Sequence, residues 1–150
     1  MKAYRVEGEM TPTEVAAGIV GHYSGPAYGT YCAPDASWGT DMTGSFQCNV
    51  NVPANAVTNF EIDVSGGGKR AFIGSGTGSF LPGSSSSFTI TGGTWKLGPV
   101  GAETSATRKA ASGALFGPTG QHIGGAWGMD AGAGNNAAVG IFQGNRDSTP

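Results

Sequence analysis

The sequence predicts an all-β protein, an eight-stranded antiparallel up-and-down β-barrel with one short N-terminal helix. Three observations support this fold class. Apolar and polar residues alternate with period two in five of the eight expected strands. Short loops and hairpin turns join nearly all of these strands, which favours a meander barrel over a sandwich. Finally, 28 of the 150 residues are glycine, and glycines permit the sharp strand curvature that barrel closure requires.

Composition narrows the function classes. Charged residues make up 12% of the chain and the formal net charge is −2, so the surface lacks the basic footprint of a nucleic-acid-binding protein. The high content of Gly, Pro and Ser can signal disorder, but the low net charge and the aromatic residues within alternating segments favour a folded domain. No apolar run approaches the length of a membrane span, so no transmembrane segment is expected.

Residues 1–18 are predicted to form an N-terminal segment with a short helix over residues 12–18. Thr11 is expected to cap this helix, Pro12 suits the first helical position, and Glu14 can bond back to the cap. A plain turn is the alternative for so short a segment. The first residues lack the apolar region of a signal peptide, so an exported protein would be represented by its mature form or by one domain of a longer precursor.

The barrel is predicted to occupy residues 19–146, beginning with a glycine-punctuated strand over residues 19–31. The next two strands, residues 42–52 and 56–65, alternate between apolar and polar side chains. Period two over that length indicates strands with one buried face. The side chains expected to face inward from these two strands are Phe46, Cys48, Val50, Val52, Thr58, Phe60, Ile62 and Val64.

A fourth strand is predicted over residues 70–80 and a fifth over residues 87–91. Glycines at a spacing of two in the fourth strand indicate sharp curvature or a close approach by another segment; they are Gly74, Gly76 and Gly78. Residues 92–109 carry the weakest pattern. Trp95 is a candidate to extend the fifth strand, and residues 98–107 are expected to form a mobile connection.

Three closing strands are predicted from short apolar runs. Residues 114–116 and 123–127 flank Gly117–Gly120, where Pro and Gly favour a hairpin turn. Residues 137–142 close the barrel, and residues 147–150 are expected to form a tail. The predicted barrel core is Phe46, Val50, Phe60, Ile62, Phe88, Ile90, Phe116, Trp127 and Ile141.

Cys32 and Cys48 are predicted to form a disulfide. Cys32 follows the first strand, Cys48 lies on the apolar face of the second, and a short loop makes these strands antiparallel neighbours. The bridge requires the chain after Tyr31 to fold back over the barrel end, bringing the two Cα atoms within about 7 Å. A disulfide indicates an exported protein, and two free thiols in a cytosolic protein are the alternative. No Cys/His cluster indicates a zinc site.

Few residues are candidates for chemistry. His22 and His122 are the only histidines, and as haem or metal ligands they would have to converge; two unrelated surface histidines are the favoured interpretation. Glu61 and Asp63 share one face of a strand, where a solvated sheet surface is favoured over an acid–base pair. No serine elbow is paired with a plausible base, so no enzyme activity and no cofactor are expected.

The closing strands resemble the β-barrel domains of transferrin-binding protein B and related bacterial surface proteins. The similar pattern is Phe116-Gly117-Pro118, a short turn, then Ile123-Gly124-Gly125 before Trp127, and the chain then ends similarly over residues 141–146. Gln121-His122 replaces the acidic turn of that family, and a lipid-anchoring cysteine is absent. The resemblance implies an eight-stranded barrel on an exported protein, at the cell surface or in the periplasm of a Gram-negative bacterium.

Two functions follow from the pattern and the resemblance. The first is a non-enzymatic binding or interaction module of an exported bacterial protein, with a protein or small-ligand partner and neighbouring domains in a longer chain. The alternative is a small-ligand carrier, such as a haem-binding barrel, that uses the interior. For a carrier, Tyr31, Trp95 and Trp127 are candidates to line the barrel mouth, although the core is the favoured location of Trp127.

Overall fold

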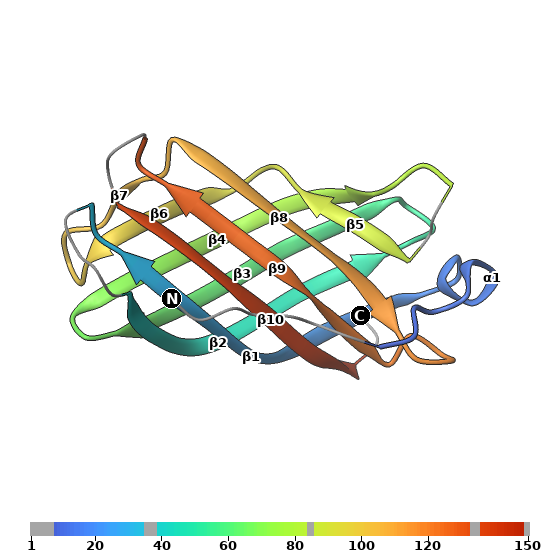
Figure 1. Ribbon diagram of the computed structural model, residues 1–150. Coiled ribbons are helices and arrows are strands. Elements are labelled where there is room, and N and C mark those ends of the chain that lie inside the picture. The colour runs from blue at the N-terminus through green and yellow to red at the C-terminus, as the bar shows by residue number, and fades with distance from the viewer. Residues whose placement is uncertain (1–7, 35–38, 84–85, 133–135, 149–150) are drawn as a thin grey trace.

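The computed structural model describes residues 8–34, 39–83, 86–132 and 136–148 (Figure 1). One short helix precedes a series of antiparallel strands that wrap into a closed barrel. The elements are α1 (Thr13–Ala16), β1 (Val20–Cys32), β2 (Thr40–Asn51), β3 (Ala56–Gly66), β4 (Lys69–Phe80), β5 (Ser87–Ile90), β6 (Thr94–Pro99), β7 (Thr104–Ser105), β8 (Arg108–Phe116), β9 (His122–Asp130) and β10 (Ala137–Ser148).

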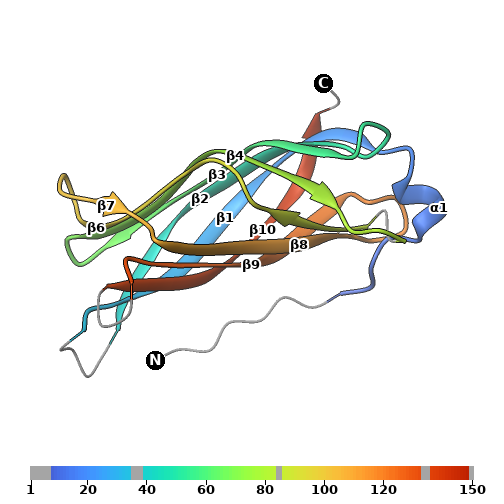
Figure 2. The ribbon, with the colours of Figure 1, turned by 90° about the horizontal axis from the view of Figure 1, so that it is seen from above.

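The barrel closes through hydrogen bonding between β1 and β10. β5 and β6 pair with successive parts of β4, so together they form one interrupted strand of the barrel wall. β7 and β8 form the next interrupted strand, because β7 pairs with β6 and β8 pairs with β5. The wall therefore contains eight strands, as predicted, and Figure 2 shows how they wrap around a common interior.

The breaks between β5 and β6 and between β7 and β8 are the part of the fold that the sequence did not predict. Residues 92–109 contain β6 and β7, so the predicted mobile connection is in part a strand pair, and Trp95 does extend the line of β5. Between β5 and β6, Gly93 has a φ of 106°. A Cβ on Gly93 would lie 2.7 Å from the Cα of Gly76, so a side chain at this kink would collide with β4.

The N-terminal helix is present but shorter than predicted, and the predicted cap is wrong. Pro12 occupies the N-cap position and no side chain caps the helix. The Thr11 hydroxyl instead donates to the carbonyl of Gly117 (2.9 Å), and its backbone N–H donates to Leu115 (2.8 Å). Thr11 therefore fastens the N-terminal segment to the turn between β8 and β9.

The alternation predicted for β3 is wrong at its start. Val57 is buried and Thr58 is exposed. Asn59 adopts a positive φ of 50°, and the pairing register shifts around it, as in a β-bulge. The extra residue reverses the faces before Phe60, whereas Phe60, Ile62 and Val64 face inward as predicted.

The interior is filled by side chains. Phe46, Phe60 and Phe142 form an aromatic cluster with ring centroids 4.6–5.5 Å apart, the distances at which aromatic pairs attract. Seven of the nine predicted core residues are buried, but Phe116 and Ile141 are only partly buried. Their neighbours Leu115 and Phe142 face inward instead. In β8 and β10 the buried face is therefore formed by the other set of alternating residues.

The predicted disulfide between Cys32 and Cys48 is wrong, because no disulfide joins the two residues. Cys48 lies opposite Tyr23 near the start of β1, whereas Cys32 ends that strand. Nine residues of extended chain separate Tyr23 from Cys32, roughly 30 Å at the usual strand rise. A bridge needs Cα atoms within about 7 Å, so these strands are neighbours but the two cysteines lie at opposite ends.

Candidate functional site

Both histidines lie on the outer wall of the barrel, at the end near α1. Nδ1 of His22 on β1 donates to Asp147 on β10 (2.6 Å), and the Ser24 hydroxyl donates to the same carboxylate. On β9, which pairs with β10, Nδ1 of His122 donates to the amide oxygen of Asn145 on β10 (2.6 Å). We call these five residues the polar row. The structure therefore brings His22 and His122 to one wall, with β10 between their strands.

Asp147 is the acidic residue of the polar row and accepts hydrogen bonds from both His22 and Ser24. The hydrogen bond from Ser24, followed by that from His22, lowers the pKa of its carboxyl group below the ordinary value. Asp147 falls in the predicted tail, but β10 continues through it to Ser148. Polar Asn145 and Asp147 alternate along the chain, and this alternation could have indicated that the strand continues.

Ser, His and Asp meet in the polar row without forming a catalytic triad. In a triad, the imidazole accepts the proton of the serine hydroxyl and the carboxylate orients the imidazole. Here the Ser24 hydroxyl and the His22 ring both donate to Asp147. The hydroxyl is thus directed at the carboxylate rather than at a base, and this geometry does not activate Ser24 as a nucleophile.

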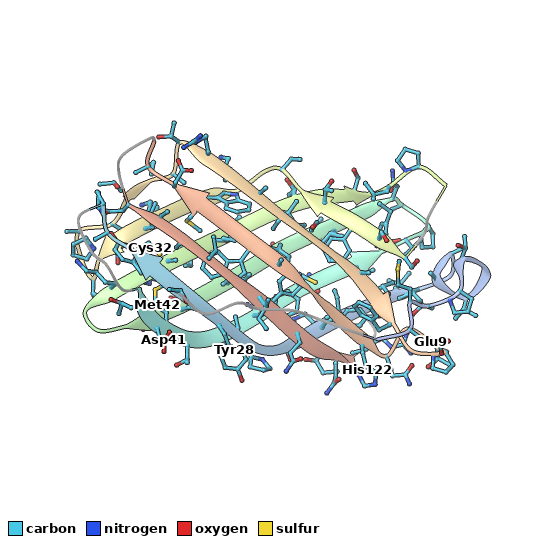
Figure 3. All side chains as sticks on the ribbon, viewed as in Figure 1. Glu9, Tyr28, Cys32, Asp41, Met42 and His122 are labelled. Carbon is cyan, nitrogen blue, oxygen red and sulfur yellow. The ribbon has the colours of Figure 1, made fainter. Side chains whose placement is uncertain are left out.

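A cleft of about 510 Å³ adjoins the polar row, between the N-terminal segment and the outer faces of β9, β10 and β1. We call it the polar cleft. Figure 3 shows Glu9 and His122 at this end of the barrel. The lining residues are Gly8, Glu9, Ser24, Gly25, Pro26, Phe116, Gly117, Pro118, His122, Ile123, Gln143, Gly144 and Asn145. Its outer side is fixed because the N–H of Gly117 donates to the carbonyl of Glu9 (2.9 Å).

An apolar groove of about 420 Å³ continues from the polar cleft, and Phe116 lines both. We call it the outer groove. Leu81, Phe116 and Ile141 supply its large apolar side chains. Its other lining residues are Ser87, Phe88, Ser112, Gly113, Ala114, Gly124, Gly125 and Ala126. The two residues wrongly assigned to the core, Phe116 and Ile141, are thus part of an exterior surface.

The predicted barrel mouth is packed. Tyr31, Trp95 and Trp127 are all buried. The Trp127 ring packs against glycines of β1 and β10: a Cβ on Gly29 would lie 2.7 Å from it, and a Cβ on Gly140 would lie 2.8 Å from it. The Trp95 ring N–H donates to the carbonyl of Gly92 (3.0 Å). The three aromatic side chains are therefore part of the packed core.

Glu61 and Asp63 do not act as a pair. Both oxygens of Asp63 accept hydrogen bonds from Arg70, at 2.9 and 2.8 Å. Glu61 accepts a longer contact from the Gln47 amide (3.4 Å). Each carboxylate therefore has its own partner on the outer wall, as expected for a solvated sheet surface.

The part of the chain that the structure describes contains no group of three or more His, Cys, Asp or Glu residues placed to hold a metal ion. None of its helices has the length and apolar character needed to cross a membrane.

The sequence matches no family model and no curated protein, but solved structures share the fold. Two mutant forms of transferrin-binding protein B from Haemophilus parasuis Hp5 superimpose with TM-scores of 0.57 and 0.58, at 14% and 18% identity, over 93% of this chain. Isotype 1 transferrin-binding protein B from serogroup B Neisseria meningitidis gives a TM-score of 0.56 at 16% identity over 92%.

The chain covers 28% of each of those structures. At these identities the likeness establishes the fold, and it confirms the barrel resemblance seen in the closing strands. The wall of eight antiparallel strands is therefore a transferrin-binding protein B-like barrel.

Proposed function

We propose that this barrel is a non-enzymatic binding module of an exported bacterial protein and that it engages its partner from the outside. The observation that carries this proposal is the contrast between the two sides of the wall. The interior is filled by buried aromatic and aliphatic side chains, whereas the polar cleft and the outer groove meet on the exterior around Phe116. Adjoining polar and apolar surfaces are what a binding site requires.

Location at the surface or in the periplasm of a Gram-negative bacterium is part of the proposal. It is supported by the shared fold with transferrin-binding protein B structures, two from Haemophilus parasuis and one from Neisseria meningitidis. Because the chain covers 28% of each of them, we further propose that residues 19–146 form one barrel domain of a longer chain. Protease treatment of intact cells that produce the full protein distinguishes a surface location from a periplasmic one.

The carrier alternative has less support. A haem carrier needs an accessible apolar cavity and converging ligands. His22 and His122 instead lie outside the barrel, each hydrogen-bonded to a side chain of β10. Haem titration tests this directly: we expect no saturable Soret shift. A saturable shift that His22→Ala and His122→Ala both leave unchanged would indicate haem inside the barrel and overturn exterior binding in favour of a carrier.

Site-specific photo-cross-linking tests exterior binding. p-Benzoylphenylalanine in place of Ile141 places the probe in the outer groove, and the same probe in place of Thr43 is a control on the exposed face of β2. In producing cells, we expect a discrete adduct from position 141 that Phe116→Asp abolishes. Equal adducts from both positions, or none from position 141, would contradict the proposal.

A further inference from the structure

The polar cleft contains more hydrogen-bonding capacity than its own residues use. The Gln143 amide and the Glu9 carboxylate have no hydrogen-bond partner among the described residues. Asn145 accepts from His122 through its oxygen, which leaves its N–H groups to donate. Since Nδ1 of His122 is the donor in that bond, Nε2 of the neutral ring is an acceptor. Donors and acceptors are thus mixed along one wall.

The charge of the polar cleft selects against ions. Among the described residues that line the cleft, Glu9 is the only acidic one and none is Lys or Arg. An anionic ligand would find no cationic partner among them, and a single exposed carboxylate does not form a cation site. The chemistry of the cleft therefore matches an uncharged polar ligand.

The cleft also offers apolar surfaces beside its polar groups. Phe116, Pro26 and Pro118 line it together with the amides. A sugar ring has hydroxyl groups that both donate and accept, and C–H faces that pack on aromatic and proline rings. The volume of about 510 Å³ lies within the range of roughly 300–1,000 Å³ found for small-molecule sites.

A peptide fits this position less well. Extended peptides gain affinity by adding a strand to a free sheet edge. β1 pairs with β2 and β10, and β9 pairs with β8 and β10, so β1, β9 and β10 offer no free ladder edge at the polar cleft. We propose that the polar cleft binds an uncharged saccharide, a ligand class for the exterior binding site proposed above and dependent on it.

The residues have distinct roles in this site. The hydrogen bond from His122 fixes the Asn145 amide, so its N–H groups are held ready to donate to a sugar hydroxyl. Gln143 supplies both a donor and an acceptor, and Phe116 supplies the packing face. Asn145 and Gln143 are exposed, so both can be replaced by alanine with little effect on folding.

Saturation-transfer difference NMR tests the inference with maltotriose, cellotriose and N,N′,N″-triacetylchitotriose as uncharged probes and sialyllactose as a charged one. We expect transfer to at least one uncharged trisaccharide, and at least a tenfold loss of its affinity in Gln143→Ala and Asn145→Ala. Asn49→Ala is the matched control, because Asn49 is an amide on the outer face of β2 outside the cleft.

Three outcomes would overturn the inference: no transfer to any uncharged probe, binding of sialyllactose alone, or an affinity that Gln143→Ala and Asn145→Ala leave unchanged. The cross-linking experiment separates this failure from failure of the proposed function. A position-specific adduct at residue 141 without a saccharide response would retain exterior binding and exclude the saccharide.

Discussion

Two buried tyrosines of β1 differ in whether their hydroxyl groups are paired. The Tyr23 hydroxyl donates to the carbonyl of Gly120 (2.5 Å), whereas the Tyr31 hydroxyl has no partner among the described residues. A buried unpaired donor costs about 1–3 kcal/mol of desolvation, and a paired one contributes about 0.5–1.5 kcal/mol. Replacement by phenylalanine should therefore have opposite effects at the two positions.

We expect Tyr31→Phe to raise the free energy of unfolding by about 1 kcal/mol and Tyr23→Phe to lower it by a similar amount. Urea unfolding at neutral pH measures both changes, and each variant is the control for the other because the strand and the change are the same. A loss of stability in both variants would show that Tyr31 has a partner after all.

Adjacent residues of β10 test the orientation that sequence analysis assigned wrongly. Ile141 and Phe142 are both apolar, so period-two alternation cannot decide which faces inward. Phe142 is fully buried among Phe46 and Phe60, and its truncation to alanine should cost about 3–5 kcal/mol. Ile141→Ala should cost less than about 1 kcal/mol, since Ile141 lines the outer groove. The reverse order in urea unfolding would restore the predicted orientation.

At the scale of elements, strand positions were predictable and strand irregularities were not. The alternation of apolar and polar residues in β2 and in the later part of β3 identifies their buried faces, because the polarity of each side chain indicates the face on which it lies. The bulge at Asn59 reverses the faces before Phe60, and nothing local in the sequence specifies it. A positive φ at a non-glycine residue is maintained by the surrounding pairing.

The interruption between β5 and β6 depends on a glycine. Gly93→Ala should destabilise the barrel by clearly more than 1 kcal/mol, because the new Cβ adds a collision with Gly76 to the strain of a positive φ. Gly101→Ala is the control: it also has a positive φ, but nothing lies within 4 Å of its Cβ position. Thermal unfolding compares them, and equal losses would mean that the kink tolerates a side chain.

The end of β10 shows why the polar row was missed. Asp147 and Ser148 are polar, and considered alone they fall in the predicted tail over residues 147–150. In the structure they pair with β1, more than a hundred positions away, and Asp147 is held by His22 and Ser24. Only the closing partner makes this segment a strand, and no local pattern reports that partner.

At the scale of the molecule, the fold was predictable and the candidate site was only partly so. Glycine content, short loops and alternation predict a closed eight-stranded barrel, because each reflects a local requirement of the wall. The polar cleft instead combines the N-terminal segment, β1, β9 and β10. Of its residues, His122 was a ligand candidate from the sequence, whereas Gln143 and Asn145 entered only through the resemblance over residues 141–146, which assigned them no role.

The stability of the whole barrel should have an acid limb and an alkaline limb. Asp147 has a lowered pKa from its bonds to Ser24 and His22, so the folded state favours its ionised form and loses that stabilisation as the pH falls below about 4. Burial raises the pKa of the Cys48 thiol, and it raises that of Tyr23 to about 12. The folded state keeps these two protons longer than the unfolded chain, so stability falls as the pH rises above about 8.5.

Melting temperatures between pH 2 and 12 test both limbs. Asp147→Asn should make the acid limb shallower, because a neutral amide has no proton to bind, and should leave the alkaline limb intact. The rest of the acid limb should persist, because Glu103 and Asp130 also have lowered pKa values. Cys48→Ala should flatten the part of the alkaline limb that begins near pH 8.5, the ordinary range of a thiol, while the later fall due to Tyr23 persists. Since no disulfide joins Cys32 and Cys48, a reductant should leave the melting temperature unchanged at every pH. An alkaline limb that is identical in Cys48→Ala and the wild type would show that burial does not raise the pKa of the Cys48 thiol in the folded state.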